Sequence, residues 1–410
     1  MNKKVIIALA VLGILLLGTV LYFVFFSSSN DGLVVTDPSA TFGEADNYQG
    51  RNGSVPDVGV ELPEAGDVVA PRLVRISLEP TVGGTVVLET VRQEVSQTGT
   101  TTATTSIPEI EVRYLEKASG NVYAYEVKAR TLTRLTNQTL PGIQEASWTD
   151  DGSWVVTRFL TKAEGGRDTL ETYVLPLEEG EAGYFLQDGL ADAFSRGVSS
   201  VVTLLTSDTG TVGTLAGIDG ANPQTVFTSP LSSLTVHNLT SGYAAFTKPS
   251  AHLDGYGFLI NSSGVFTRVL GPLKGLSLLP GSSGDTVIYS ALSGRSLDLG
   301  YINTDTYERV TLPVNTLSEK CVWKKDESLV YCAVPKTLSG TLPDDWHQGV
   351  VSFSDRFWRI NLEERVATLI FDPSTIADVD IDAVSLALDE DADVLIFTNK
   401  KDGTLWAYDL

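Results

Sequence analysis

Two stretches of this 410-residue chain share one pattern: Ile143-Gln-Glu-Ala-Ser-Trp148-Thr-Asp-Asp-Gly152-Ser-Trp154-Val-Val-Thr157 and Cys321-Val-Trp323-Lys-Lys-Asp326-Glu-Ser-Leu-Val-Tyr-Cys332. Each stretch consists of a short strand that reaches a tryptophan, a polar turn around an aspartate, and a second strand. Weaker copies make up a degenerate unit of roughly 42 residues, a length typical of propeller blades. The array therefore predicts a β-propeller, in which each repeat forms one blade.

The repeat divides the C-terminal part of the chain into seven segments: 72–139, 143–188, 190–230, 231–271, 272–313, 315–372 and 379–410. Short β-branched and aromatic runs alternate with turn residues there, and only Ala191–Arg196 suggests a single helical turn. The last segment contains three expected strands, so we expect residues before Pro71 to complete its blade and close the ring. The predicted fold class is all-β, a single propeller of about seven four-stranded blades, with six or eight as alternatives.

The N-terminus predicts a membrane anchor. It begins Met1-Asn-Lys3-Lys4, and residues 5–26 carry no charged side chain. As a helix they would span about 33 Å, enough to cross a bilayer core of about 30 Å. The run ends in Tyr22-Phe-Val-Phe-Phe26, which suits a membrane interface better than a cleavage site. We predict a cytoplasmic tail (1–4) and a single-pass signal anchor (5–26), with a cleaved signal peptide or a buried helix as alternatives.

Residues 27–70 are expected to form a flexible acidic linker. They contain eight acidic residues and one basic residue, Arg51, among frequent Gly, Pro and Ser. Such a composition does not bury enough apolar surface to fold alone. Only Val58–Leu62 is expected to pair as a strand. The propeller domain then spans residues 71–410 and lies outside the cytoplasm, because Lys3 and Lys4 hold the N-terminus inside.

The charge of the chain excludes some partners. The formal charge is −22 and includes the two N-terminal lysines, which leaves −24 for the exported remainder. Such a surface repels nucleic acid and anionic lipid headgroups and favours cations or basic partners. Solvation of an exported domain explains the same charge without any partner.

The repeat resembles that of a known family. Trp148-Thr-Asp-Asp151-Gly152-Ser, followed by an apolar strand, resembles the W-S-P-D-G-x repeat of TolB-like and WD40-like bacterial β-propellers. The resemblance covers roughly residues 72–410 and specifies a fold rather than a function. It implies that Asp151-Gly152 closes the turn between the first two strands; Asp326-Glu327 replaces this pair in the sixth segment. Residues 27–70 are too short and polar for the N-terminal α/β domain of TolB, so the anchored chain resembles membrane-bound surface propellers of bacteria.

The two cysteines flank one predicted hairpin. If its turn centres on Asp326 and Glu327, Cys321 and Cys332 lie directly opposite each other, about 4.5–5.5 Å apart at Cα and within disulfide range. Ala146 and Thr157 hold the equivalent positions in the second segment. A disulfide is the first expectation, and two buried free thiols are the alternative.

Two acidic series invite comparison with calcium loops: Asp378, Asp380 and Asp382, and then Asp389, Asp391 and Asp393. Alternate carboxylates converge on a hard cation when a loop curls. However, Val394 stands where a calcium loop has glycine, and Lys400 where it has its closing glutamate. We therefore expect no cofactor, with Ca²⁺ as a minor alternative to a solvated strand face.

An insertion at 335–353 interrupts the sixth segment between its second and third strands. It carries Asp344, Asp345, Trp346 and His347, and propeller loops commonly hold binding sites. These four residues are our candidate binding patch. The alternatives are a loop that braces the ring, and a catalytic His347 assisted by Asp344 or Asp345.

No motif for nucleophilic, metal or phosphate chemistry occurs in the sequence. We therefore expect a non-enzymatic binding or scaffold module for an envelope protein, peptide or glycan. The alternatives are a propeller hydrolase acting on surface polysaccharide or peptide, which we expect to gather acids or Arg at the channel mouth, and a structural spacer.

Overall fold

The computed structural model describes residues 67–70, 72–98, 101–137, 140–162, 168–178, 181–294, 296–391 and 393–410. The predicted tail (1–4), the anchor (5–26), the Val58–Leu62 strand and all but the last four residues of the predicted linker lie outside these ranges. Within them, no helix has the length and apolar character needed to cross a membrane.

The described strands form seven antiparallel sheets, which we number as blades 1 to 7 along the chain. The first four have these strands. Blade 1 contains β3 (Val86–Thr98), β4 (Thr101–Leu115), β5 (Val122–Glu126) and β6 (Thr131–Arg134). Blade 2 contains β7 (Ile143–Trp148), β8 (Trp154–Lys162), β9 (Asp168–Pro176) and β10 (Tyr184–Phe185). Blade 3 contains β11 (Leu190–Arg196), β12 (Ser200–Ser207), β13 (Gly210–Gly217) and β14 (Gln224–Ser229). Blade 4 contains β15 (Leu234–Asn238), β16 (Tyr243–Thr247), β17 (Asp254–Ile260) and β18 (Phe266–Lys274).

The remaining sheets follow the same order. Blade 5 contains β19 (Ser277–Pro280), β20 (Thr286–Ser293), β21 (Ser296–Asn303) and β22 (Arg309–Thr311). Blade 6 follows the short helix η1 (Ser318–Lys320) and contains β23 (Cys321–Trp323), β24 (Leu329–Pro335), β25 (Asp355–Asn361) and β26 (Val366–Phe371). Blade 7 contains β27 (Ala383–Leu388), β28 (Val394–Asn399) and β29 (Leu405–Asp409), with β2 (Leu73–Arg75) and β1 (Asp67–Ala70) at its outer edge. Two short helices, α2 (Asp344–His347) and α3 (Pro373–Ile376), lie in the loops after β24 and β26.

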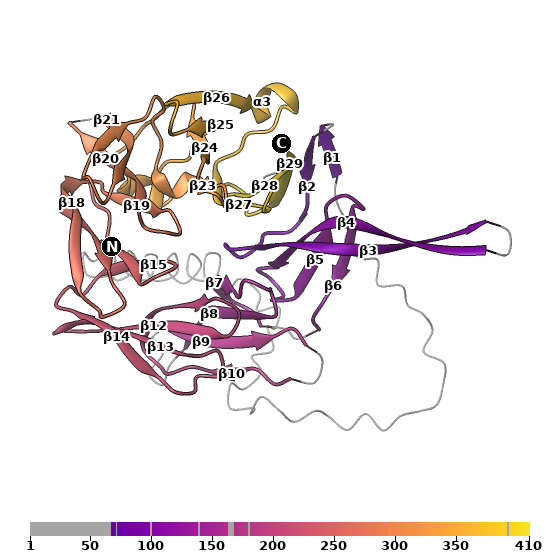
Figure 1. The fold of residues 1–410 in the computed structure, drawn as a ribbon, viewed down its shortest axis with the longest axis horizontal. Coiled ribbons are helices and arrows are strands. Elements are labelled where there is room, and N and C mark those ends of the chain that lie inside the picture. The colour runs from indigo at the N-terminus through magenta and orange to yellow at the C-terminus, as the bar shows by residue number, and fades with distance from the viewer. Residues whose placement is uncertain are drawn as a thin grey trace, which may run out of the picture. The chain divides into compact units, whose positions relative to one another are not determined.

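Seven apolar clusters join the blades into a ring. Each cluster combines side chains of two successive blades, from blade 1 with blade 2 through to blade 7 with blade 1. Central strands such as β16 and β28 are buried along almost their whole length, because a neighbouring blade covers each face. The arrangement, visible in Figure 1, is consistent with a seven-bladed propeller.

The chain closes the ring with its N-terminal strands. β2 pairs antiparallel with β29, and Leu73 lies opposite Tyr408. A contribution from the start of the chain was expected, but from residues before Pro71. The fourth strand is instead β2, which we had placed in the first segment. β1 occupies the last four residues of the predicted linker and pairs outside β2.

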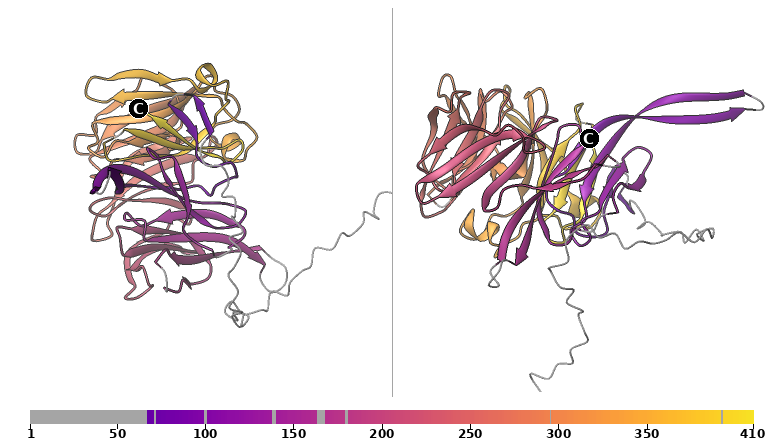
Figure 2. Two further views of the ribbon diagram at one scale, coloured as in Figure 1. Left: turned by 90° about the vertical axis from the view of Figure 1, so that its right-hand side faces the viewer. Right: turned by 90° about the horizontal axis from the view of Figure 1, so that it is seen from below.

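Two further details differ from the sequence predictions. Ala191–Arg196 is not a helical turn but most of β11, because it pairs along its length with β12. In the first segment, the sequence runs Thr85–Thr90 and Glu111–Leu115 predict two short strands, but the hairpin that contains them is much longer. β3 and β4 pair without interruption from Val86–Arg113 to Thr98–Thr101, and they extend past the other strands of blade 1 (Figure 2).

Candidate binding site

The turns between first and second strands are built alike in blades 2 and 6. Asp151 accepts hydrogen bonds from the Ser153 backbone and hydroxyl, and Asp326 does the same for Ser328. The next residue has a left-handed backbone in both blades, with φ of 66° at Gly152 and 56° at Glu327. Glycine adopts this conformation without strain, whereas glutamate does not.

Glu327 gains contacts that glycine cannot make. Its carboxylate accepts hydrogen bonds from the Ser282 hydroxyl at 2.6 Å and from the Ser283 backbone at 3.0 Å, both in blade 5. These bonds between blades offset part of the backbone strain. In the Asp-Glu variant of the repeat, hydrogen bonds to the preceding blade therefore stabilise the turn that glycine stabilises in blade 2.

Two tryptophans at equivalent repeat positions connect neighbouring blades. The Trp148 indole N–H donates to the Gly84 carbonyl at 3.2 Å, and that of Trp323 donates to the Leu279 carbonyl at the same distance. In each case the acceptor belongs to the preceding blade. The two hydrogen bonds therefore fix both indole side chains at the boundary between two blades.

These tryptophans line a hollow of about 570 Å³, which we call the channel hollow. Its wall comes from the start of β3, the end of β7 and its turn, β23, and the end of β27, all first strands of their blades. Figure 1 shows these strands towards the middle of the ring. The residues that line it are Gly84–Val87, Ala146–Asp150, Val322, Trp323, Lys325 and Leu386–Glu390.

The channel hollow carries charges of both signs. Lys325 of blade 6 forms an ion pair with Glu390 of blade 7, and both side chains are largely exposed. Asp389 is buried and accepts a hydrogen bond from the Val394 backbone at 2.7 Å; burial raises the pKa of its carboxyl. Asp150 adds a further acid to the lining. Apolar walls with a few charged groups are typical of ligand sites.

The insertion places Trp346 in the interior, contrary to its expected role in a recognition patch. Its side chain is 4% exposed and packs with Leu297, Leu317, Leu342 and Phe353. The indole N–H donates to Asp382 at 3.1 Å. These contacts match the alternative in which the loop braces the ring.

The other three residues of the predicted patch have separate partners. Asp344 accepts a hydrogen bond from the Ala251 backbone at 2.6 Å, which ties the insertion to blade 4. Asp345 accepts one from the Thr341 backbone within the loop. His347 lies 2.8 Å from Glu319, so its acidic partner is neither Asp344 nor Asp345.

Glu319 is shared between His347 and Ser277. Ser277 donates to its other carboxylate oxygen at 2.7 Å. Burial raises the pKa of Glu319, but the hydrogen bonds from His347 and Ser277 outweigh this effect and lower it. Because Ser277 is buried and donates to the acid rather than to the histidine, the order is not that of a nucleophilic triad.

A buried cation anchors the insertion to blades 6 and 7. Lys320 is fully buried, and its Nζ lies 2.6 Å from Asp382 and 2.8 Å from Asp355. Burial raises the pKa of Asp355 to about 6 against the attraction of Lys320. Lys400 donates to the Trp346 carbonyl and lies 3.9 Å from its ring centroid.

A second hollow of about 660 Å³, the insertion hollow, lies beside this anchor. Leucines from blade 5 and from the insertion line it, and His252 of blade 4 adds a polar group. Its lining residues are Ala251, His252, Leu292, Gly294, Ser296, Leu297 and Leu338–Leu342. The insertion thus borders a hollow, but through Leu338–Leu342 rather than through the predicted patch.

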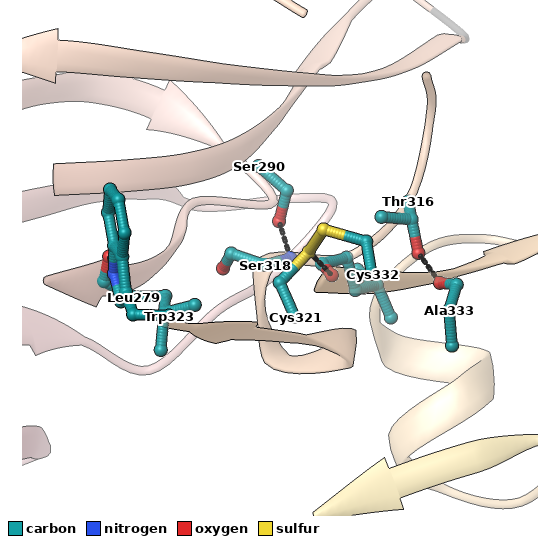
Figure 3. Close-up of a disulfide and its surroundings, with 9 residues drawn as sticks. Leu279, Ser290, Thr316, Ser318, Cys321, Trp323, Cys332 and Ala333 are labelled. Atoms are coloured by element: carbon teal, nitrogen blue, oxygen red, sulfur yellow. Dashed lines mark hydrogen bonds between the residues drawn. A yellow bond between two sulfur atoms is a disulfide. The ribbon is translucent and has the colours of Figure 1, made fainter. Parts of the chain in front are cut away.

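The two cysteines lie opposite each other in β23 and β24 and are joined in a disulfide, with Cα atoms 4.1 Å apart. Figure 3 shows the bridge beside the hydrogen bond from Thr316 to the Ala333 carbonyl. Ala146 and Thr157 occupy the equivalent opposed positions in blade 2. The bridge is therefore an addition to one blade of the common pattern.

The acidic series near the C-terminus is dispersed among separate partners. Asp380 pairs with Lys401, Asp382 with Lys320, and Asp389 with the Val394 backbone. Across the described ranges, no group of three or more His, Cys, Asp or Glu side chains is arranged to hold a metal ion. The carboxylates that the calcium hypothesis grouped do not converge.

Sequence reasoning identified Trp148 and Trp323 as repeat markers but not as walls of a hollow. Lys325 and Glu390 were missed because their pairing joins residues of different blades. The recurrence of tryptophan at the end of a first strand was a usable signal, since first strands face the propeller axis.

Comparison with known proteins yields structural matches only. No family model matches the chain, and no curated protein matches it in sequence. An oligogalacturonate lyase in complex with manganese matches at 14% identity and a TM-score of 0.47, over 80% of this chain and 98% of that one. The β-propeller domain of Cps50 (Swd1) from Myceliophteria thermophila matches at 9% identity and 0.47, over 73% and 93%. TolB from Acinetobacter baumannii matches at 10% identity and 0.42, over 69% and 78%.

At these identities the matches concern the β-propeller fold and carry no information on activity or partner. Membership of the TolB-like repeat family remains a prediction from the sequence motif. What the chain's own sheets establish is an all-β propeller architecture.

Proposed function

We propose that this protein is a membrane-anchored extracytoplasmic binding module of the cell envelope, which receives a protein loop, peptide or glycan in its channel hollow. The observation that carries the proposal is the hollow itself. It is lined by the buried Trp148 and the half-buried Trp323, together with the charged pair Lys325–Glu390. Aromatic side chains supply contact area for sugar rings and apolar side chains, and the charged groups fix the orientation of the ligand.

The predicted location supports this proposal. The uncharged segment 5–26 and the lysines before it favour an anchor with the propeller outside the cytoplasm. The negative charge of the exported part disfavours nucleic acid as a ligand.

The proposal is tested with the full-length chain in detergent, immobilised and offered cell-wall glycan fragments and a displayed peptide library. The informative variant is Lys325→Glu, which reverses one charge at the hollow without altering the core. Arg365→Glu is the matched control, because Arg365 also forms an exposed ion pair between blades, with Glu308.

Binding that falls at least about tenfold for Lys325→Glu, and stays unchanged for Arg365→Glu, supports a ligand in the channel hollow. If the two variants lower binding equally, or if neither lowers it, the ligand binds outside the channel hollow. Turnover of an offered polymer, rather than its retention, would instead support the hydrolase alternative.

A further inference from the structure

The β3–β4 hairpin continues beyond its own blade as a two-stranded ribbon. β5 pairs with β4 only over Glu111–Leu115, whereas β3 and β4 pair over 13 positions. From Thr90 to the tip, neither strand has a third neighbour among the described strands. An isolated two-stranded ribbon is marginally stable in water, so a ribbon of this length favours a further strand.

The two edges of the ribbon differ. The β4 edge carries Pro108, which lacks a backbone donor, and the buried Glu109, which accepts hydrogen bonds from the Lys128 and Ala129 backbones. The β3 edge has neither proline nor bulge, although such features normally protect an edge strand from pairing. The exposed fraction of Val91 on this strand is 60%. The β3 edge is therefore open to strand addition.

The sequence of β3 reads almost the same in both directions in chemical terms. Around Gln93 it runs Thr90-Val91-Arg92-Gln93-Glu94-Val95-Ser96. At equal distances on the two sides of Gln93, Arg92 matches Glu94, Val91 matches Val95, and Thr90 matches Ser96. A strand with this symmetry is complementary to an antiparallel copy of itself.

We propose that a second copy of this chain pairs along the β3 edge, so that two ribbons form one four-stranded antiparallel sheet about a two-fold axis at Gln93. A two-fold axis normal to the sheet keeps every side chain on its own face. Arg92 then lies opposite Glu94 of the second copy, and this pair occurs twice. Val91 lies opposite Val95 of the second copy.

Neighbouring registers lack this complementarity. Because the axis preserves the faces, the register changes by two positions at a time. An axis at Arg92 opposes two arginines, and an axis at Glu94 opposes two glutamates; like charges in direct opposition are unfavourable. In the ribbon itself, the Arg92 guanidinium lies 3.8 Å from Glu109, beyond hydrogen-bond distance, so it has donors for a second partner.

Cross-linking tests the register in the full-length chain. The only two cysteines of the sequence are joined to each other, so Gln93→Cys introduces a single free thiol. At the two-fold axis, the Cα atoms of the two introduced cysteines would lie about 4.5–5.5 Å apart, within disulfide range. We expect a covalent dimer on oxidation in detergent, seen by electrophoresis without reductant.

Val91→Cys is the matched control on the same strand. In the proposed register, the two copies of this residue lie four positions apart along the strand, or about 13 Å, too far for a disulfide. The variant should stay monomeric on the gel. Cross-linking of Val91→Cys as efficient as that of Gln93→Cys would contradict the register.

A charge exchange tests the pairing without cysteine chemistry. Arg92→Glu places two pairs of like charges in opposition and should raise the dissociation constant of the dimer by about tenfold or more. The double variant Arg92→Glu/Glu94→Arg restores both pairs and should return the constant to within about threefold of the original. Sedimentation of the full-length protein in detergent measures both.

A full-length protein that sediments as a monomer at tens of micromolar and gives no Gln93→Cys cross-link would overturn the proposal. So would a dimer that is equally stable in the original protein and in both charge variants. Neither result bears on the channel hollow, since the ribbon residues tested here do not line it.

Discussion

At the scale of single residues, Lys320 shows most clearly what holds the insertion. Its ammonium lies between two buried carboxylates and donates to the Ala383 carbonyl at 2.8 Å. Removing the cation leaves Asp355 and Asp382 buried without their direct ion pair, whereas the ion pairs as a whole contribute little net stability. The cost of a substitution therefore arises from the charges left behind.

We expect Lys320→Met to lower the free energy of unfolding by about 3–5 kcal/mol, measured by urea denaturation. Lys401→Met is the control, because Lys401 pairs with Asp380 near the surface. Surface pairs of this kind contribute about 0–1 kcal/mol. If both variants lose the same stability, the Lys320 network does not anchor this region.

Asp355 should give the protein a specific pH dependence. Burial raises the pKa of its carboxyl to about 6, above the value of about 3.9 expected in the unfolded chain. Between these values the folded state binds a proton that the unfolded state does not. The contribution of this group to stability is therefore present below pH 4 and is lost as the pH rises towards 6.

The measurement is the urea midpoint of the wild type and of Asp355→Asn at intervals from pH 4 to pH 8. The stability of the wild type relative to this variant should fall as the pH rises from 4 to 6 and stay level above that. A constant difference across the range would show that Asp355 does not titrate in this window.

At the scale of elements, the first turns of blades 2 and 3 show two different reasons for a glycine. Gly152 has a φ of 66°, and a Cβ there would lie 3.0 Å from the Leu88 side chain and 3.2 Å from that of Val86. Gly197 has a similar φ of 62°, but a Cβ there meets nothing within 4 Å. The two positions share the backbone constraint and differ in the steric one.

Gly197→Ala should therefore lower the free energy of unfolding by about 1 kcal/mol, through the left-handed backbone alone. Gly152→Ala should lose more, about 2 kcal/mol, because β3 must also move. Thermal unfolding of the two variants side by side gives the difference. Equal losses would show that the contact with β3 adds nothing.

The disulfide acts at the same scale. It closes a loop across the β23–β24 turn, with a sequence separation of 11 residues. In the chain-entropy account, a loop of this length stabilises the folded state by about 2–3 kcal/mol. The double variant Cys321→Ala/Cys332→Ala should lose about this amount in urea, and dithiothreitol should not lower the stability of the variant further.

At the scale of the whole molecule, sequence patterns predicted the parts of the fold that depend on local order. The blade 6 strands and the opposed cysteines follow from residues close in sequence. The closing strand and the ribbon were misjudged, because β2 pairs with a strand more than 300 residues away and nothing local stops β3 at residue 90. Trp346 was misplaced for a similar reason: its burial depends on Asp382 of the next blade.

Because β2 closes the ring, a substitution that disrupts β2 should lower the stability of the whole propeller. β2 joins β29 by backbone pairing, and Leu73 is fully buried among side chains of blades 6 and 7. Val74→Pro removes a donor and imposes a fixed φ in this short strand, so we expect it to lower the free energy of unfolding by about 3 kcal/mol. Val91→Pro makes the same change in the part of the β3–β4 hairpin that extends beyond the other strands of blade 1, and should leave propeller unfolding within about 1 kcal/mol of the original. Intrinsic fluorescence of the tryptophans during urea denaturation compares the two. Equal sensitivity to both substitutions would show that the ring is not held closed by β2.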